Sequence, residues 1–566
     1  MTRILSTNII SPLGLTTEEN YAAIRRGETS LKQMDGCLGV PGRFCVGIFS
    51  DEQRAALQVE GFSWFESLVL RSVKDALARS AADPSSPRTI LILGTSTAGI
   101  EELGDVPEKD RNYLAPDLAV KKVAGHLGFV NDPVTVSNAC ISGATAQMLA
   151  DRLIVAGYYD TAIVCGVDVL SAFVLAGFDS FKALSPVACK PFDIERLGLN
   201  IGECAATVVL SGNPGTDTDA WYIVDGCLNN DAYHVSAPIP SGDGVCRAIQ
   251  KILTPERKST LACVAAHGTA TMFNDQMESK AIENAGLGDL PTTTIKPHYG
   301  HTFGASSIVE SIIMMCSLDE GVILPVHGFE ELGVSGKISI CSQPESTDRR
   351  AFIKLQSGFG SCNGAMIYAK TAAPAPVPAK ADYEEVKRLR ITPDSLCIDG
   401  NAVPMEAHGA SLVTEIFKKY LADGSRFFKM DLYSRLAYAG TGLLAKEALD
   451  AYDPEDRALF VFTQNGSLLA DRKHLSTFSD PASFFPSPAV FINTLPNVVL
   501  GEIAVKNAIK GETTLVMLPC RDEAAMQRIL EATTSATRPS VMICGWVDCD
   551  AEDSFIADLK MLKIKS

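Results

Sequence analysis

The stretch VTVSNACISGATAQMLADRLIVAG, residues 134–157, contains the change of pattern that decides the fold. Residues 134–139 have small or β-branched side chains and predict a strand. Residues 141–157 have small and apolar side chains at helical spacing and predict a helix. Cys140 therefore lies at a strand–helix junction. A helix N-terminus lowers the pKa of a thiol, because its unpaired amides and dipole favour the thiolate. Taken alone, the residue is better explained as a buried structural cysteine.

The segments around this junction predict an α/β domain. RTILILG (88–94), TAIVCGVD (161–168) and AATVVL (205–210) are typical of short buried strands. They alternate with helical stretches such as residues 63–81, whose apolar positions recur at helical spacing. Strand–helix alternation favours a largely parallel sheet with helices on both faces. We therefore interpret residues 1–370 as one α/β unit.

The 566 residues are too many for one ordinary core, and two or more domains are expected. Residues 371–382, TAAPAPVPAKAD, are the clearest linker, since their prolines favour an extended chain. Residues 383–566 form a second α/β segment. Half of a layered repeat would leave an apolar face uncovered, so we expect this tail to pack on the first domain or on a second copy.

The tail resembles a degenerate copy of the N-terminal half. Chance similarity between α/β segments is the alternative explanation. In the predicted alignment, Leu495 stands where Cys140 stands, so the copy lacks the nucleophile. The matched segments are 433–450 with 67–81, 457–468 with 88–99, and 487–517 with 132–164.

Composition excludes several classes of function. Hydrophobic residues make up 46% and charged residues 21%, as in globular proteins. A net charge of −17 without a long basic run argues against nucleic acid as a partner. The 16 cysteines are scattered without a CxxC pair, which favours a reduced, cytoplasmic location and no metal site. No stretch of 18 apolar residues predicts a membrane helix, and the N-terminus does not resemble a signal peptide.

Two histidine blocks follow Cys140 along the chain. AAHGTATMFND (265–275) sets His267 at the end of an apolar run, and IKPHYGHTFGA (295–305) sets His301 between a glycine and a threonine. Glycines and small residues allow the backbone to turn sharply and approach a substrate closely. One thiol and two imidazoles can perform acyl transfer with no metal and no organic cofactor.

The order Cys…His…Lys-x4-His resembles that of the β-ketoacyl-[acyl carrier protein] synthases of the thiolase superfamily, and most closely their elongating Cys-His-His class. KPFDIERLGLNIGECAA (190–206) and GFGSCNGA (358–365) resemble two further blocks of that family. The resemblance spans about residues 3–370. It implies a thiolase-like fold, in which duplicated α/β halves form layers in the order α-β-α-β-α.

The resemblance also implies a division of labour. Cys140 would take an acyl chain from a carrier, and His267 and His301 would assist decarboxylation of a malonyl thioester by stabilising its enolate. Phe359 would gate the site, and its N–H together with that of Cys140 would form an oxyanion hole. The implied supporting residues are Lys296, Glu310, Asp275 and Glu278.

The implied partner is an acyl carrier protein, loaded with an acyl or a malonyl group. Because carriers are acidic, docking requires basic residues near the pocket mouth. The candidate patch consists of Lys109, Arg111, Lys121 and Lys122. The resemblance further implies a homodimer through the sheet that carries Cys140, and it allows a heteromer with another synthase-like subunit.

Two alternatives remain open at this point. Thiolases use a second cysteine as base on a glycine-rich loop, and Cys362 occupies such a loop. Some relatives of the synthases are instead non-elongating subunits, which set chain length or act as scaffolds and lack the cysteine. The presence of Cys140 argues against that function for residues 1–370. The sequence does not indicate the length or saturation of the acyl chain.

Overall fold

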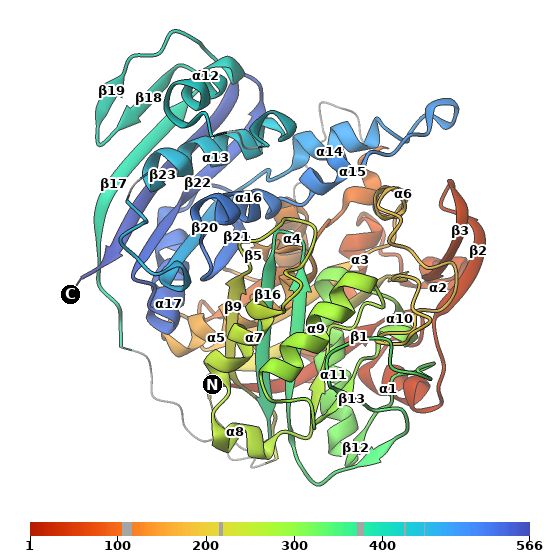
Figure 1. Cartoon of the computed structure of the whole chain (residues 1–566). Helices are drawn as coiled ribbons and strands as arrows, with labels where there is room; N and C mark the ends of the chain where they lie inside the picture. Colours follow the sequence, from red (N-terminus) through yellow and green to blue (C-terminus); the bar gives the residue numbers. More distant parts are fainter. Residues whose placement is uncertain are drawn as a thin grey trace.

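A computed structural model describes most of the chain (Figure 1). Of the predicted linker, residues 371–378 lie outside the described part. The described residues are 1–104, 116–213, 215, 219–370, 379–423, 426–446 and 448–565.

The N-terminal half contains a five-stranded sheet. Its strands are β1 (Thr2–Ile10), β4 (Thr89–Gly94), β5 (Val134–Val136), β6 (Thr161–Asp168) and β8 (Cys204–Ser211). They pair in the order β5, β4, β6, β8, β1, with parallel pairs on both sides of β4 and antiparallel pairs on both sides of β8. Four of the strands, β4, β5, β6 and β8, are those predicted from the sequence.

The second half repeats this arrangement. Its strands are β9 (Tyr222–Asn230), β10 (Cys263–Ala265), β11 (Pro291–Thr293), β15 (Ala351–Gly358) and β16 (Cys362–Ala369). They pair in the order β11, β10, β15, β16, β9. This matches the first sheet strand for strand in position and direction. The two sheets join where β1 pairs with β9.

Helices cover both sheets and fill the space between them. α5 (Ser142–Val155) and α11 (Ser306–Asp319) are buried on nearly every side, as expected for helices of a middle layer. α3 (Trp64–Ala78) packs on the outer face of the first sheet, and α7 (Asp243–Ile252) with α9 (Met272–Asn284) covers the second. The layers therefore run α-β-α-β-α, which confirms the thiolase-like fold.

Short elements complete residues 1–370. The helices are α1 (Thr17–Arg25), α2 (Asp51–Leu57), α4 (Pro116–His126), α6 (Ala172–Ser180), α8 (Pro255–Thr260) and α10 (Lys296–Tyr299). The strands are β2 (Leu31–Cys37), β3 (Val40–Gly47), β7 (Ile201–Gly202), β12 (Val322–Ile323), β13 (Ser339–Ile340) and β14 (Glu345–Ser346).

The tail has a sheet of its own. Its main strands are β17 (Tyr383–Thr392), β20 (Arg457–Thr463), β21 (Thr513–Met517), β22 (Val541–Ala551) and β23 (Ser554–Ile564). They pair in the order β21, β20, β22, β23, β17, with the same pattern of parallel and antiparallel neighbours as the first sheet. β21 therefore holds the place of β5. The strands β18 (Ser395–Ile398) and β19 (Asn401–Val403) extend the edge at β17.

One buried carboxylate network occurs in both sheets. In the first, Asp168 at the end of β6 accepts hydrogen bonds from the Thr95 hydroxyl and from the backbone of the next two residues. In the tail, Asp548 near the end of β22 accepts from the Thr463 hydroxyl and likewise from the backbone of the two residues after it. The match extends from strand order to individual contacts.

The tail helices correct one part of the predicted alignment. α17 (Glu523–Thr537) follows β21 as α5 follows β5, whereas the segment around Leu495 precedes β21. Residues 488–491 form a short helix and not the expected strand, because Pro488 lies at its first turn and favours helix initiation. The match of 487–517 with 132–164 is therefore wrong, and Leu495 does not occupy the nucleophile position. The other tail helices are α12 (Ala410–Ile416), α13 (Leu432–Ala445), α14 (Leu468–Leu475), α15 (Pro488–Phe491) and α16 (Val498–Asn507).

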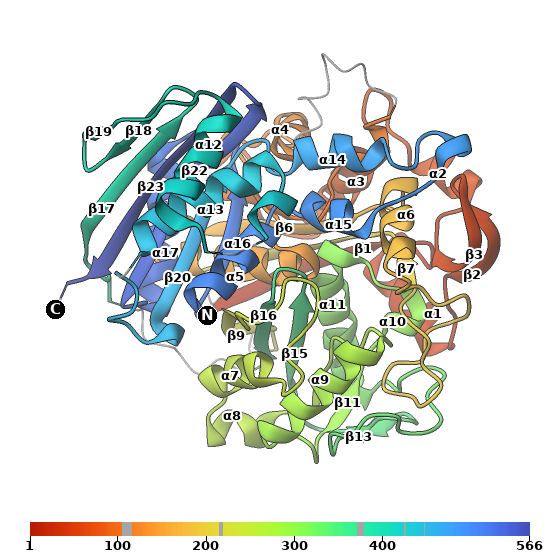
Figure 2. The same ribbon diagram turned by 45° about the horizontal axis from the view of Figure 1, so that its top comes forward.

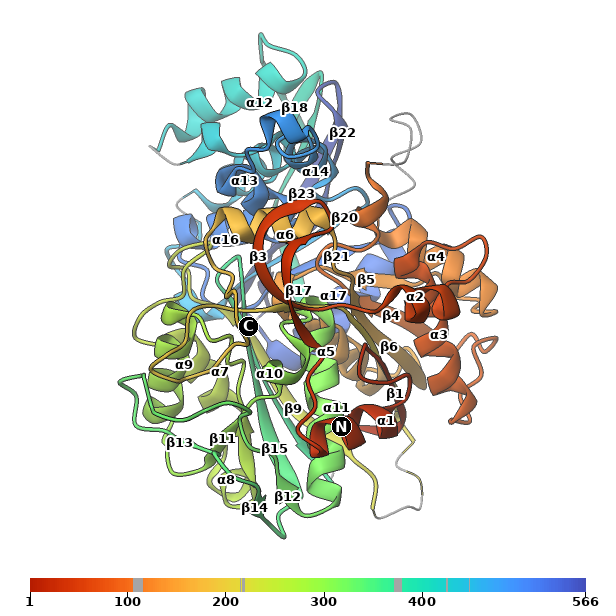
Figure 3. The same ribbon diagram turned by 90° about the vertical axis from the view of Figure 1, so that its right-hand side faces the viewer.

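β21 joins the tail to the first domain. It pairs antiparallel with β5, with Val516 opposite Val136 and Met517 opposite Thr135. Figure 3 shows the tail sheet continuing from the N-terminal sheet at this edge. The homodimer implied by the family resemblance would need the same edge of β5. Because the chain's own β21 occupies it, that interface is not free.

The apolar face of the tail sheet is covered within the chain, in agreement with the expectation that the tail packs on the first domain. α17 contributes Met526, Ile529 and Leu530 to the main core, where they cover part of this face. Where β17 and β23 extend beyond α17, the sheet instead carries Arg388 paired with Asp558. No single helix among the described residues is long and apolar enough to cross a membrane; one bent pair, Pro488–Thr494 with Val498–Asn507, passes on length and composition only.

Candidate active site

Cys140 lies in a single turn between β5 and α5, the 3-10 segment Ala139–Ile141. Ala139 has φ of 48°, a left-handed conformation that is strained for a residue with a side chain. Gly143, in the first turn of α5, allows close approach, since a Cβ there would lie 2.3 Å from the Gly304 carbonyl oxygen. The turn therefore brings the nucleophile against the loop that contains His301.

The thiol is less acidic than its place at a helix N-terminus predicts. Cys140 is partly exposed and lines a cavity of about 310 Å³. Burial of the sulfur raises the pKa of Cys140 to about 12, although the positive charge of Lys296 acts in the opposite direction. The expected lowering of the thiol pKa is wrong, because desolvation outweighs the favourable charge of Lys296.

His267 follows β10, and two carboxylates hold its loop. The His267 N–H donates to Glu278 Oε1 at 2.6 Å, and the Gly268 N–H donates to Glu278 Oε2 at 2.8 Å. Asp275 accepts from the Thr269 N–H at 3.0 Å. Burial raises the pKa of Glu278 to about 7 and that of Asp275 to about 6. Both residues thus act on the backbone of the histidine loop and lie away from the solvent.

His301 is oriented by a serine on α11. Its Nδ1 lies 2.9 Å from Ser306 Oγ, and the Thr302 N–H donates to the same oxygen at 3.2 Å. Ser306 Oγ accepts from that N–H and has one proton of its own, which it can donate to His301 Nδ1. With the proton placed so, the hydrogen of the ring is on His301 Nε2, which is buried and has no partner among the described residues.

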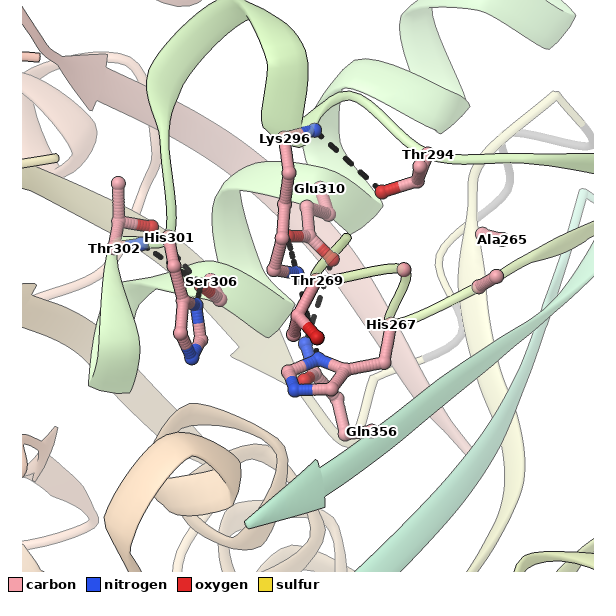
Figure 4. A network of polar contacts seen from close by, with 12 residues as sticks. Ala265, His267, Thr269, Thr294, Lys296, His301, Thr302, Ser306, Glu310 and Gln356 are labelled. Carbon is pink, nitrogen blue, oxygen red and sulfur yellow. Dashed lines mark hydrogen bonds and ion pairs between the residues drawn. The ribbon is translucent and has the colours of Figure 1, made fainter. Parts of the chain in front are cut away.

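A buried ion network lies behind His267. Lys296 Nζ donates to Glu310 Oε1 at 2.5 Å and lies 3.4 Å from His267 Nδ1. Lys354 pairs with the other oxygen of Glu310, also at 2.5 Å. An ammonium has only donors, so His267 Nδ1 must accept and its Nε2 must carry the hydrogen. Figure 4 shows Lys296 and Glu310 behind the His267 ring.

Both imidazoles are neutral donors. Burial holds the pKa of His267 and of His301 well below the usual range, and the charge of Lys296 lowers both further. The ring centroids are 5.1 Å apart with planes at 81°, and both rings line the cavity that contains Cys140. The site thus combines one thiol with two neutral N–H donors, a set suited to stabilising transient negative charge.

Phe359 stands in the tight turn between β15 and β16. Its ring stacks on Phe178 at 6.0 Å and borders the same cavity. The tail holds this turn, since Asn497 Nδ2 donates to the Phe359 carbonyl oxygen at 2.8 Å. The backbone N–H of Phe359 as an oxyanion donor stays a prediction.

Of the four predicted docking residues, the two that the structure describes lie away from the cavity. Lys109 and Arg111 lie outside the described residues. On α4, Lys121 pairs with Asp132 at 2.9 Å, and Lys122 pairs with Glu66 at 2.6 Å. Neither lysine lines the cavity that contains Cys140.

Sequence reasoning missed several residues that shape the site. Ser306 and Lys354 set the state of the two histidines through contacts that only the fold creates. Asp168 accepts from the Gly304 N–H at 2.7 Å and so holds the His301 loop. Its position at the end of a predicted strand was the available signal. Cys362, the candidate second cysteine, is 2% exposed and packs behind the Phe359 turn, which gives the thiolase alternative no support.

Comparison with known proteins identifies the family. The model of the β-ketoacyl synthase N-terminal domain matches residues 8–213, and that of the C-terminal domain matches residues 222–330. The chain belongs to the β-ketoacyl synthase family. A 3-oxoacyl-[acyl-carrier-protein] synthase 2 of Rhizobium meliloti (strain 1021) is 27% identical over 417 residues, which cover 64% of this chain and 97% of the relative.

Solved structures extend the likeness to the tail. A ketosynthase of a type II polyketide synthase, in complex with its acyl carrier protein, has a TM-score of 0.56 at 20% identity and covers 65% of this chain and 98% of its own. A PfaC ketosynthase–chain length factor has a TM-score of 0.75 at 14% identity. It covers 100% of this chain, while this chain covers 78% of it. At these identities the likeness is one of fold.

Proposed function

We propose that this ketosynthase condenses an acyl group carried on Cys140 with malonyl-[acyl carrier protein]. The products are 3-oxoacyl-[acyl carrier protein], carbon dioxide and free carrier, in fatty-acid or polyketide-type biosynthesis. The observation that carries this proposal is the single cavity in which the Cys140 thiol faces two neutral imidazoles.

In the first step, the sulfur of Cys140 attacks the carbonyl carbon of the acyl-carrier thioester. The carrier thiolate leaves and takes the proton of the Cys140 thiol, so an acyl-enzyme and a free carrier thiol result. The strained turn at Ala139 presents the sulfur to the cavity. Loss of the thiol proton is costly in the buried site, so transfer of that proton is coupled to the attack.

In the second step, the bond between the malonyl carboxylate and its α-carbon breaks. Carbon dioxide leaves, and the electron pair forms the enolate of an acetyl thioester. His267 and His301 donate from Nε2 to the thioester oxygen, where the negative charge develops. The enolate carbon then attacks the acyl carbonyl, and the Cys140 thiolate leaves and takes up a proton from solvent.

We further propose that residues 383–566 are a degenerate half-synthase domain. The shared strand order and the matching Asp168 and Asp548 networks support this interpretation. Arg521 lies in the turn between β21 and α17, four residues after the end of the strand. Cys140 lies at the same distance after the end of β5. The tail would therefore act as an in-chain partner without a nucleophile of its own.

The test separates the two half-reactions. Cys140→Ala should abolish both acylation, read by intact-protein mass, and condensation, read by product mass. His301→Asn should retain acylation and lose decarboxylation of malonyl-carrier, since one of the two donors to the enolate changes. Condensation by the Cys140→Ala variant, or unchanged decarboxylation by His301→Asn, would refute the proposed roles. A wild-type protein that forms no acyl-enzyme would favour a non-elongating scaffold.

A further inference from the structure

A short tail segment reaches the rear of the Cys140 site. α15 lies against α6, and Figure 2 shows the two helices side by side. Phe491 inserts between the aromatic side chains of α6, with its ring centroid 5.4 Å from that of Phe178 and 6.3 Å from that of Phe173. The fit depends on Gly177, because a Cβ there would lie 2.2 Å from the Phe491 ring.

The two sides of Cys140 differ sharply in free volume. The cavity on the histidine side measures about 310 Å³. The cavity on the other side measures about 10 Å³, roughly enough for one water molecule. Phe491 and Leu495 from the tail form part of the wall of this rear cavity, together with Phe178 and Phe303.

The chemistry assigns each space to one reactant. The malonyl thioester must reach His267 and His301, so it occupies the large cavity. An acyl chain on Cys140 must then extend to the rear, where Phe491 is 2% exposed and enclosed by other aromatic rings. Densely packed aromatic walls yield little without displacing several neighbours.

We propose that Phe491, seated beside Leu495, is an in-chain stop that restricts the acyl group on Cys140 to short chains. This inference rests on the proposed function and names its acyl substrate class. The wall of the acyl site is then supplied by the tail, which explains why a domain without a nucleophile contacts the nucleophile turn.

The experiment measures acylation of Cys140 in the full chain. Acyl-carriers from acetyl to dodecanoyl are offered singly, and the rate of acyl-enzyme formation is read by intact-protein mass. The wild type should take butyryl about 10,000-fold faster than octanoyl, since octanoyl has four more methylenes and each unaccommodated one costs roughly tenfold. Phe491→Ala should raise the octanoyl-to-butyryl ratio about 100-fold, and Phe491→Leu should raise it less.

Two features keep the test decisive. Phe485→Ala is the matched control, because Phe485 belongs to the same tail region but is 85% exposed; its ratio should equal that of the wild type. Phe491→Leu keeps an apolar side chain at the site if the alanine variant does not fold. Equal rates of butyryl and octanoyl transfer in the wild type would overturn the inference. So would folded Phe491 variants with an unchanged ratio.

Failure of the proposed function has a different signature. In that case no acyl group of any length would appear on Cys140, and the length inference would fall with it. If acylation occurs but ignores chain length, only the inference about Phe491 is lost.

Discussion

Each imidazole of the site depends on one polar contact at Nδ1. Ser306 Oγ fixes His301, and Lys296 Nζ fixes His267. In both rings the contact leaves the hydrogen on Nε2, the atom that faces the substrate. Burial keeps both rings neutral. The site therefore offers two N–H donors, and substrate binding does not have to desolvate an imidazolium charge.

Replacing Ser306 by alanine tests this at the residue scale. The substitution removes the donor to His301 Nδ1, so the Nε2–H tautomer is no longer enforced. Decarboxylation of malonyl-carrier should slow roughly 10- to 100-fold, less than the effect of deleting an oxyanion-hole donor outright. Carbon dioxide release is the measurement, and acylation of Cys140 should persist.

The control for this variant is Ser307→Ala. Ser307 is the next residue on α11, is fully buried, and its hydroxyl has no hydrogen-bond partner among the described residues. Its loss should leave decarboxylation near the wild-type rate. If Ser306→Ala and Ser307→Ala behave alike, the serine does not set the tautomer.

The raised pKa of Cys140 predicts a pH dependence. Below its pKa of about 12, a thiol gains tenfold in thiolate with each pH unit. Alkylation of Cys140 by iodoacetamide should therefore accelerate about tenfold per unit from pH 7 to pH 9. Free cysteine, with a pKa near 8.5, should begin to level off in the same range. A plateau for Cys140 below pH 9 would contradict the burial argument.

The sequence was sufficient to predict the reactive residues and insufficient to predict what positions them. Cys140, His267 and His301 lie in glycine-rich blocks that are recognisable locally. Lys354, by contrast, lies in an ordinary buried strand 87 residues beyond His267, and its charge matters only because β15 and β10 are neighbours. The pKa of Cys140 was misjudged because burial is a property of the fold.

At the scale of elements, the joint between α5 and β21 links the tail to the nucleophile. Asn138, two residues before Cys140, accepts from the Leu515 N–H at 3.0 Å. On the same side, Arg152 of α5 pairs with Glu512 at 2.8 Å, with both side chains almost fully buried. The nucleophile turn is therefore held partly by residues of the tail.

Glu512→Ala should be strongly destabilising, because it leaves the Arg152 guanidinium buried without its carboxylate. We expect a loss of about 3–5 kcal/mol in the free energy of unfolding. Urea denaturation provides the measurement. Asp132→Ala breaks the half-exposed Lys121–Asp132 pair and should cost about 1 kcal/mol or less. Similar losses of unfolding free energy in the two variants would show that the buried Arg152–Glu512 pair stabilises the fold no more than a half-exposed pair does.

The tail also shows where sequence patterns mislead. The apolar run around residues 488–492 resembles a strand by composition, but Pro488 starts a helix there and the strand follows at β21. The strands β4, β6 and β8 were predicted because each is a continuous apolar run within a clear α/β alternation. The tail lacks that regularity, so the alignment slipped by one strand–helix unit.

At the scale of the whole molecule, the tail occupies the sheet edge through which the family resemblance implies a dimer. β21 covers the edge of β5, and α17 packs beside α5 in the middle layer. The tail sheet ends in a charged face at β17, with Arg388 and Asp558 paired on it, which suits contact with solvent. The apolar surface of this half-repeat is thus covered within one chain.

We therefore expect a monomer in solution. Light scattering coupled to size exclusion should give a mass near 60.4 kDa across the micromolar range, because β21 of the same chain already pairs with the edge of β5. A protein of known dimeric mass serves as calibration. A mass near twice that value would contradict the expectation and would point to another surface.

The paired strands β5 and β21 belong to one chain, and this affects how the protein responds to dilution. An acyl pocket walled by a separate subunit disassembles when the subunits fall below their dissociation constant. Here the wall bearing Phe491 is tethered to the thiol that it serves, so its local concentration stays fixed by the chain itself. The pocket should therefore stay assembled at any protein concentration, and no other subunit can replace the wall that carries Phe491.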